Sequence, residues 1–190
     1  QTTDISAWIG FVESRGFKKI ILIGHSAGAA AVREYQSEEQ DIRVAGLVLA
    51  SGSVDSSPSI DSSQYIQAAS LLAEGKGEEL IKDPKRSFPS YISAATFMDI
   101  ANSPLEYKDF FGVHTPNTGI TKIQCPILAF YGTDSDVGNE KTLELLKAST
   151  QKQSKPPINV TTTMIKGAEH MYMGKEVQVA DVIIKWISGI

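Results

Sequence analysis

The chain has little of what metal, redox or nucleic-acid chemistry requires: one cysteine, three histidines and no block of basic residues. The single cysteine, Cys125, excludes an internal disulfide, and the three histidines are too far apart in the sequence to indicate a zinc site. Lysine and arginine are scattered among the acidic residues, and the net charge is −4, which argues against a phosphate-backbone partner. We therefore expect no metal site, no cofactor and no nucleic-acid partner.

Long apolar runs are absent as well. No run approaches the roughly 18 residues that span a bilayer, and the first residues, QTTDIS, have neither the basic start nor the apolar core of a secretion signal. The 190 residues are 42% hydrophobic and 21% charged, which is enough for a buried core. A globular domain without a membrane span is predicted, and a cytoplasmic location is the expectation.

Four short segments have the composition of strands: residues 18–24, 44–50, 126–132 and 158–165. Helical periodicity is found around and between them, in residues 5–12, 27–36, 139–148 and 176–188. Because parallel strands need a crossover connection, the alternation predicts an α/β fold, a parallel sheet with helices on both faces. The fourth segment is more polar and is expected near a sheet edge.

Residues 52–122 interrupt this alternation and are too long for a connection. We expect a core of residues 1–51 and 123–190, with 52–122 forming a mostly helical cap over the carboxyl edge of the sheet. The insertion carries five large apolar side chains that would either roof a pocket or form the insertion's own core: Phe97, Met98, Tyr107, Phe110 and Phe111.

The stretch IILIGHSAGAA, residues 20–30, places Ser26 between two glycines where a predicted strand meets a predicted helix. A serine hydroxyl is a weak nucleophile, so it must project from the backbone beside a base and beside N–H donors for an oxyanion. A sharp turn meets these needs and brings Gly24 and Gly28 close together, where only small residues fit. The N–H of Ala27 is then an oxyanion donor. A phosphate-binding loop is the alternative, but its additional glycines or lysine are missing.

A nucleophilic serine needs a base and an acid, which this architecture supplies from loops at the carboxyl ends of later strands. Asp134 and Asp136 follow the third predicted strand, and His170 lies between the last strand and the last helix. His170 is therefore the predicted base. The side chain of His25, inside the serine motif, is predicted to lie on the opposite side of the turn from that of Ser26 and only to pack or form hydrogen bonds locally, and His114 is interpreted as an ordinary histidine.

The motifs KKIILIGHSAG, ILAFYGTDSDVG and GAEHMYMGKE together resemble the α/β-hydrolase superfamily along nearly the whole chain. The resemblance implies an esterase-type serine hydrolase with a small helical cap. It makes Ser26 the nucleophile, His170 the base and Asp134 the acid that orients the imidazole.

The position of the acid departs from the family's pattern. Family members carry the aspartate three residues after the glycine that closes the strand, and this chain has Ser135 there. Asp134 is preferred because Val137 then follows it at the spacing that the family favours. Asp136 is the alternative acid.

The resemblance implies hydrolysis of a small-molecule carboxylic ester through an acyl-enzyme, without a cofactor. A thioesterase, amidase or acyltransferase with the same triad is an alternative, and so is a non-catalytic ligand receptor with this fold. We call the turn at Ser26 the elbow and the predicted strand that leads into it the elbow strand. A full member of the fold has about four strands before the elbow strand, whereas one helix precedes it here. We therefore expect this chain to be the carboxyl-terminal part of the fold, without its amino-terminal strands. A missing segment is expected to pair along residues 18–23 and to supply the second oxyanion donor.

Overall fold

The computed structural model describes residues 2–52, 62–82, 91–103, 109, 111, 119–153 and 159–190. The chain divides into two compact units, one made of residues 1–54 and 109–190 and the other of residues 55–108. No helix in these described ranges is long and apolar enough to cross a membrane.

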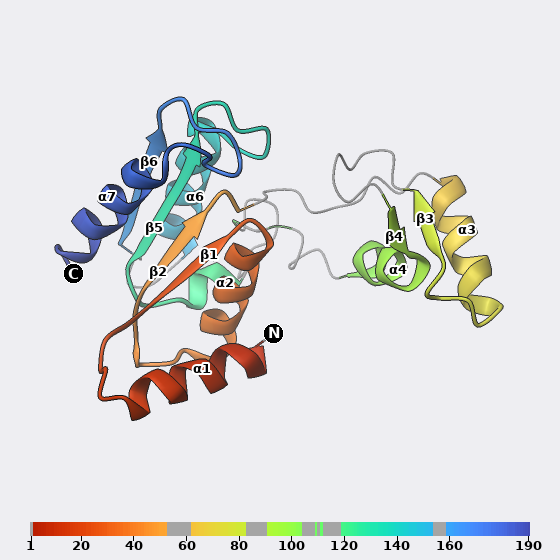
Figure 1. Cartoon of the computed structure of the whole chain (residues 1–190), viewed down its shortest axis with the longest axis horizontal. Helices are drawn as coiled ribbons and strands as arrows, with labels where there is room; N and C mark the ends of the chain where they lie inside the picture. Colours follow the sequence, from red (N-terminus) through yellow and green to blue (C-terminus); the bar gives the residue numbers. More distant parts are fainter. Residues whose placement is uncertain are drawn as a thin grey trace. The chain divides into compact units, whose positions relative to one another are not determined.

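The first unit is built on a parallel sheet of four strands in the order β1-β2-β5-β6 (Figure 1). The strands are β1 (Ile20–His25), β2 (Val44–Ala50), β5 (Ile127–Gly132) and β6 (Val160–Ile165). Because all four run in the same direction, their carboxyl ends meet at one edge of the sheet. The predicted α/β fold is confirmed, and the polar strand β6 lies at a sheet edge as expected.

Helices cover both faces of this sheet. They are α1 (Thr2–Ser14), α2 (Ala27–Glu39), the short 3-10 helix η1 (Gly119–Lys122), α6 (Glu140–Gln153) and α7 (Glu176–Ile187). Successive side chains of a strand point to opposite faces, so Leu47 of β2 packs in one core with Val32 of α2 and Leu146 of α6. Its neighbour Val48 packs in a second core with Trp186 of α7. Burial on both faces explains why the strands read as continuous apolar runs.

Strand β1 forms the edge of the sheet opposite β6. Within the described part of the chain it pairs only with β2, and its Ile23 is 54% exposed. An apolar groove lies beside it, lined by β1 and by α1 residues that include Trp8. An edge strand presents backbone N–H and C=O groups that have no ladder partner. The segment expected to pair along residues 18–23 would bind here, and that expectation stays a prediction.

The second unit contains α3 (Ser62–Ala73), β3 (Leu80–Lys82), β4 (Tyr91–Ser93) and α4 (Ala94–Asn102). The insertion was expected to be mostly helical, and it contains these two helices, but the antiparallel pairing of β3 with β4 was not predicted. Strands of three residues are too short to show a two-residue period. The unit also ends earlier than the predicted insertion, because Phe111 and Ile120 lie in the core of the first unit.

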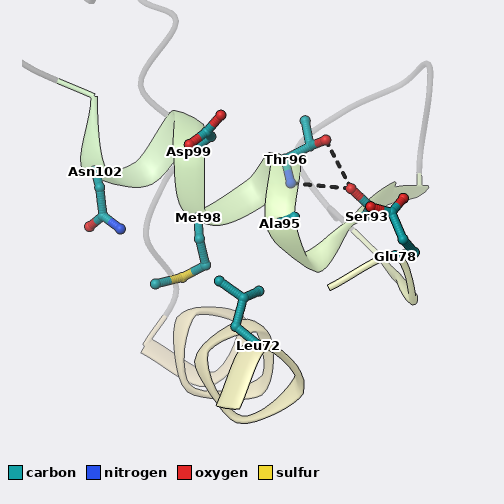
Figure 2. A pocket seen from close by; sticks show the side chains of 8 residues that line it. All are labelled: Leu72, Glu78, Ser93, Ala95, Thr96, Met98, Asp99 and Asn102. Carbon is teal, nitrogen blue, oxygen red and sulfur yellow. Dashed lines mark hydrogen bonds between the residues drawn. The ribbon is translucent and has the colours of Figure 1, made fainter. Parts of the chain in front are cut away.

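The second unit has a small core and an open groove of about 400 Å³. Leu72 of α3 and Met98 of α4 point toward one another at this groove (Figure 2). Ser93 caps α4, since its hydroxyl oxygen accepts the N–H of Thr96. None of the predicted catalytic residues lines this groove.

The large apolar side chains of the predicted insertion have different surroundings. Phe97 is buried in the core of the second unit, and Met98 packs against that core. Phe111 is buried in the core of the first unit. Both buried phenylalanines are therefore core residues, whereas Tyr107 and Phe110 lie outside the described residues.

Candidate active site

The turn from β1 to α2 holds Ser26 in a strained backbone conformation, with φ 55° and ψ −121°. A residue with a side chain rarely has positive φ, and such strain costs on the order of 1–3 kcal/mol. Two hydrogen bonds hold the turn: the N–H of Ser26 donates to the carbonyl of Ala50 over 2.9 Å, and the N–H of Ala29 donates to the carbonyl of Ser26 over 3.0 Å. The chain thus makes the sharp strand-to-helix turn that the serine motif predicts.

The two glycines of the motif differ in their surroundings. A Cβ on Gly24 would lie 2.2 Å from the carbonyl oxygen of Gly28, which is an impossible contact. A Cβ on Gly28 would meet nothing within 4 Å. The steric reason that predicts a glycine at both positions therefore applies, among the described residues, to Gly24 alone.

His170 lies in the turn between β6 and α7, and its ring reaches Ser26 from there. Nε2 of His170 is 3.0 Å from Oγ of Ser26, although the two residues are 144 positions apart. The hydroxyl donates to Nε2 when that nitrogen carries no proton, and the ring proton then resides on Nδ1. The structure therefore brings the predicted nucleophile and the predicted base into hydrogen-bond contact.

The other ring nitrogen of His170 lacks a partner. Nδ1 is buried, and no described group forms a hydrogen bond with it. In a Ser-His-Asp triad the acid would accept the proton of this nitrogen. Asp134 and Asp136 are both exposed in the turn after β5, and neither bonds to Nδ1. The expectation that an aspartate lies on Nδ1 is not met in this structure.

The turn after β5 is tied by other contacts to Gly167 and Ala168, which shortly precede His170. The N–H of Asp134 donates to the carbonyl of Ala168 over 2.9 Å, and the N–H of Gly167 donates to the Thr133 hydroxyl over 2.8 Å. The same hydroxyl donates to the Asp134 carboxylate over 2.9 Å, so this carboxylate is directed to Thr133 and not to the imidazole. Among the described contacts, no hydrogen bond joins Asp136 to the segment around His170.

The base loop, defined here as residues 169–173, is anchored by the side chain of its own residue Tyr172. Tyr172 is buried and has φ 59°. Its hydroxyl donates to the carbonyl of Phe130 over 3.2 Å and lies 2.6 Å from the hydroxyl of Ser51, at the end of β2. Burial raises the pKa of Tyr172, so the phenol stays a donor. Sequence reasoning missed Ser51, whose only signal is its position directly after a buried strand.

Glu169, the first residue of the base loop, binds two backbone N–H groups of the same loop. Its carboxylate accepts the N–H of Met171 over 2.8 Å and the N–H of Met173 over 3.0 Å. These two backbone donors lower the pKa of Glu169. Glu169 was not singled out in the sequence, where its only signal is its place beside the predicted base.

The remaining predicted site residue, Ala27, is exposed at the start of α2 directly after Ser26. The first N–H groups of a helix have no partner within it and carry the positive end of the helix dipole. In the part of the chain that the structure describes, no group of three His, Cys, Asp or Glu residues could hold a metal ion. The described groups that meet at this site are the hydroxyl of Ser26, the imidazole of His170 and the first N–H groups of α2.

The sequence matches the family described as Alpha/beta hydrolase family over residues 2–182. None of the curated proteins matches the chain. Among solved structures, the monoacylglycerol lipase of Paleococcus ferrophilus is 19% identical, with a TM-score of 0.65 and coverage of 97% of this chain and 72% of that one.

Two further structures are similar to this chain. Est1E from Butyrivibrio proteoclasticus is 17% identical, with a TM-score of 0.60 and coverage of 99% of this chain and 68% of that one. The thioesterase domain from the curacin biosynthetic pathway is 12% identical, with a TM-score of 0.58 and coverage of 96% and 71%. At such identities the likeness concerns the fold, and this chain spans 68% to 72% of the length of these three structures.

Proposed function

The chain belongs to the alpha/beta hydrolase family, and on that premise we propose that it is a serine hydrolase that cleaves a small-molecule carboxylic ester through an acyl-enzyme. The observation that supports the proposal best is the 3.0 Å separation between His170 Nε2 and Ser26 Oγ. A base at this distance removes the hydroxyl proton as the oxygen attacks, which is what makes serine nucleophilic at neutral pH.

In the proposed reaction Oγ of Ser26 attacks the ester carbonyl while Nε2 of His170 takes the hydroxyl proton. The carbonyl oxygen becomes an oxyanion, which accepts a hydrogen bond from the N–H of Ala27. When the tetrahedral intermediate collapses, the C–O bond to the alcohol breaks, and His170 returns the proton to the leaving alcohol. Water then attacks the acyl-enzyme by the same steps and releases the acid and free Ser26.

We propose Asp134 as the acid and Asp136 as its alternative. The support for Asp134 is the pair of hydrogen bonds that join Thr133 and Asp134 to Gly167 and Ala168, just before the base. The carboxylate must exchange the hydroxyl of Thr133 for the Nδ1 proton of His170. Since Asp134 is exposed, its side chain has room to change rotamer.

The unpartnered Nδ1 of His170 favours a second candidate, a ligand receptor that keeps the hydrolase fold without turnover. A buried imidazole without its acid does not hold the correct tautomer well, and such triads lose several orders of magnitude in rate.

Within the enzyme proposal, a thioester or an amide is the alternative to the ester as the substrate. An acyl acceptor other than water is the alternative in the second half of the reaction. The part of the insertion 52–122 that forms the second unit, residues 55–108, is proposed as the cap that sets substrate range. The segment expected along residues 18–23 is proposed as the source of the second oxyanion donor.

The test uses the purified protein and its Ser26→Ala variant with a fluorophosphonate probe and a panel of p-nitrophenyl esters, a thioester and an anilide. The enzyme proposal predicts labelling and ester hydrolysis that both disappear in Ser26→Ala. A folded wild-type protein that neither labels nor hydrolyses any of these substrates supports the receptor instead. If the thioester or the anilide is turned over faster than every ester, that compound's class would replace the ester as the proposed substrate.

A further inference from the structure

We infer that His25, the residue before the proposed nucleophile, is a positioning residue that holds the base loop so that His170 reaches Ser26. The inference rests on the proposed function for its kinetic consequence, but the contacts that carry it do not depend on any activity. His25 closes β1 and is partly buried. Its ring bonds to the carbonyl of His170, 145 positions away, so the prediction that His25 makes only local contacts is wrong.

The first contact is a hydrogen bond from the ring of His25 to the backbone of the base loop. Nε2 of His25 lies 2.8 Å from the carbonyl oxygen of His170. A carbonyl oxygen only accepts, so Nε2 of His25 carries the proton and donates. This nitrogen cannot at the same time accept the proton of Ser26, which separates the role of His25 from that of the base.

The second contact concerns the same peptide group. The carbonyl of His170 and the N–H of Met171 belong to one planar peptide. His25 donates to the carbonyl, and the carboxylate of Glu169 accepts the N–H over 2.8 Å. With both polar ends occupied, the plane of this peptide is fixed, and with it the Cα of His170 from which the imidazole projects.

The ring of His25 also fills the space between the base and the residue that anchors the base loop. Its centroid lies 4.9 Å from that of His170 and 5.8 Å from that of Tyr172, against which it packs edge to face. The imidazole of His170 has no described partner on Nδ1. Packing against His25 and the bond to Ser26 are therefore the described contacts that hold this ring in place.

Because Ser26 directly follows His25, one peptide bond joins the donor that fixes the base loop to the nucleophile. The turn at Ser26 and the base loop are thus connected through a single residue. Misplacing a catalytic group by about 1 Å can cost on the order of 100-fold in rate. Removing this connection should therefore lower turnover more than it lowers substrate binding.

Two variants separate the donor from the ring. His25→Phe keeps a flat ring and removes the donor, whereas His25→Gln keeps an amide N–H as far from Cβ as Nε2 and removes the ring. We expect His25→Phe to lower kcat for an ester and the rate of fluorophosphonate labelling about 10- to 100-fold, with KM within about threefold of wild type. His25→Gln should recover most of the rate. Tyr35→Phe is the matched control, since it removes a hydrogen bond to Asp41 from the far end of α2.

Hydrogen exchange of the base loop gives a readout that needs no activity. In His25→Phe the amides of residues 169–173 should exchange faster than in wild type and in His25→Gln, while Tyr35→Phe leaves them unchanged. Unchanged exchange in His25→Phe, or wild-type labelling and kcat in that variant, would overturn the inference. So would equal rate losses in all three variants, which would indicate general destabilisation. If the wild-type protein neither hydrolyses esters nor labels, the proposed function is wrong. The exchange data would still decide whether His25 holds the base loop.

Discussion

The two nitrogens of His170 face regions that the sequence specifies to different degrees. On the Nε2 side, the elbow is set by the backbone: Gly24 touches Gly28, Ser26 has φ 55°, and the hydroxyl lies 3.0 Å from the ring. The acid expected for Nδ1 would come from the turn after β5, where Asp134 and Asp136 are exposed and neither forms a hydrogen bond with Nδ1. A site held by close backbone packing is fixed by local sequence, whereas a partner chosen by side-chain rotamers on an exposed turn is not.

Replacing the two aspartates one at a time is expected to give the largest effect and to sharpen this comparison. Asp134→Asn should lower kcat for an ester by about 10² to 10⁴, because an asparagine cannot stabilise the imidazolium or hold its tautomer. Asp136→Asn should stay within about threefold of wild type. The measurement is steady-state hydrolysis of a p-nitrophenyl ester, with circular dichroism as the check on folding.

The reverse pattern, a large loss in Asp136→Asn alone, would assign the acid to Asp136. Equal, small effects in both variants would mean that neither aspartate serves the base.

The glycines of the elbow test the other side of the comparison. Gly24→Ala should destabilise the first unit by about 2–4 kcal/mol, because its Cβ would lie 2.2 Å from the carbonyl oxygen of Gly28 and backbone must move. Gly28→Ala should be neutral or stabilising by up to about 1 kcal/mol, since alanine favours a helix and its Cβ meets nothing within 4 Å. Chemical denaturation measures both. If the two variants are equally stable, the close packing described for the elbow is incorrect.

The anchor of the base loop should give a smaller effect. Tyr172→Phe removes the hydroxyl that donates to the carbonyl of Phe130 and pairs with Ser51, and the buried groups left behind should cost about 1–3 kcal/mol. Ser51→Ala, which leaves the bond to Phe130, should cost less. Thermal unfolding of the two variants measures this order, and a larger loss in Ser51→Ala would contradict it.

The smallest effect is expected at Asp41, at the end of α2 opposite the elbow. Hydrogen bonds from Arg43 hold the pKa of Asp41 well below its usual value of 3.8. The carboxylate therefore stabilises the folded state above about pH 4, and this contribution is lost as the pH falls toward the folded-state pKa. Asp41→Asn should lower the Tm by a few degrees at pH 7 and by less at pH 3. A Tm difference that is the same at both values would show that the ion pair does not contribute.

Much of the fold could be predicted from the sequence because its elements carry repeating signals. The run from Val44 to Ala50 is apolar at every position but one, and it forms β2 with the same bounds, since a strand covered on both faces tolerates no polar side chain. The pairing of β3 with β4 could not be predicted, because strands of three residues offer no period.

For the candidate site, the sequence indicated residue types and order but not side-chain geometry. The G-x-S-x-G motif predicts a sharp turn, since such a turn leaves room only for a glycine at position 24. Nothing in the spacing of Asp134 and Asp136 decides which carboxylate faces the imidazole, since that depends on rotamers and on competing donors such as the Thr133 hydroxyl. His25 was misjudged because its partner, the carbonyl of His170, is a backbone group that no sequence pattern marks.

The proposed function depends above all on Ser26 as the nucleophile and His170 as its base. The most direct measurement is peptide mapping by mass spectrometry after brief reaction of the protein with a fluorophosphonate, in parallel with His170→Ala. We expect a single phosphonyl adduct on the peptide that contains Ser26, with labelling at least about 100-fold slower in His170→Ala. An adduct on a different serine, or labelling of Ser26 at the same rate in both proteins, would contradict it.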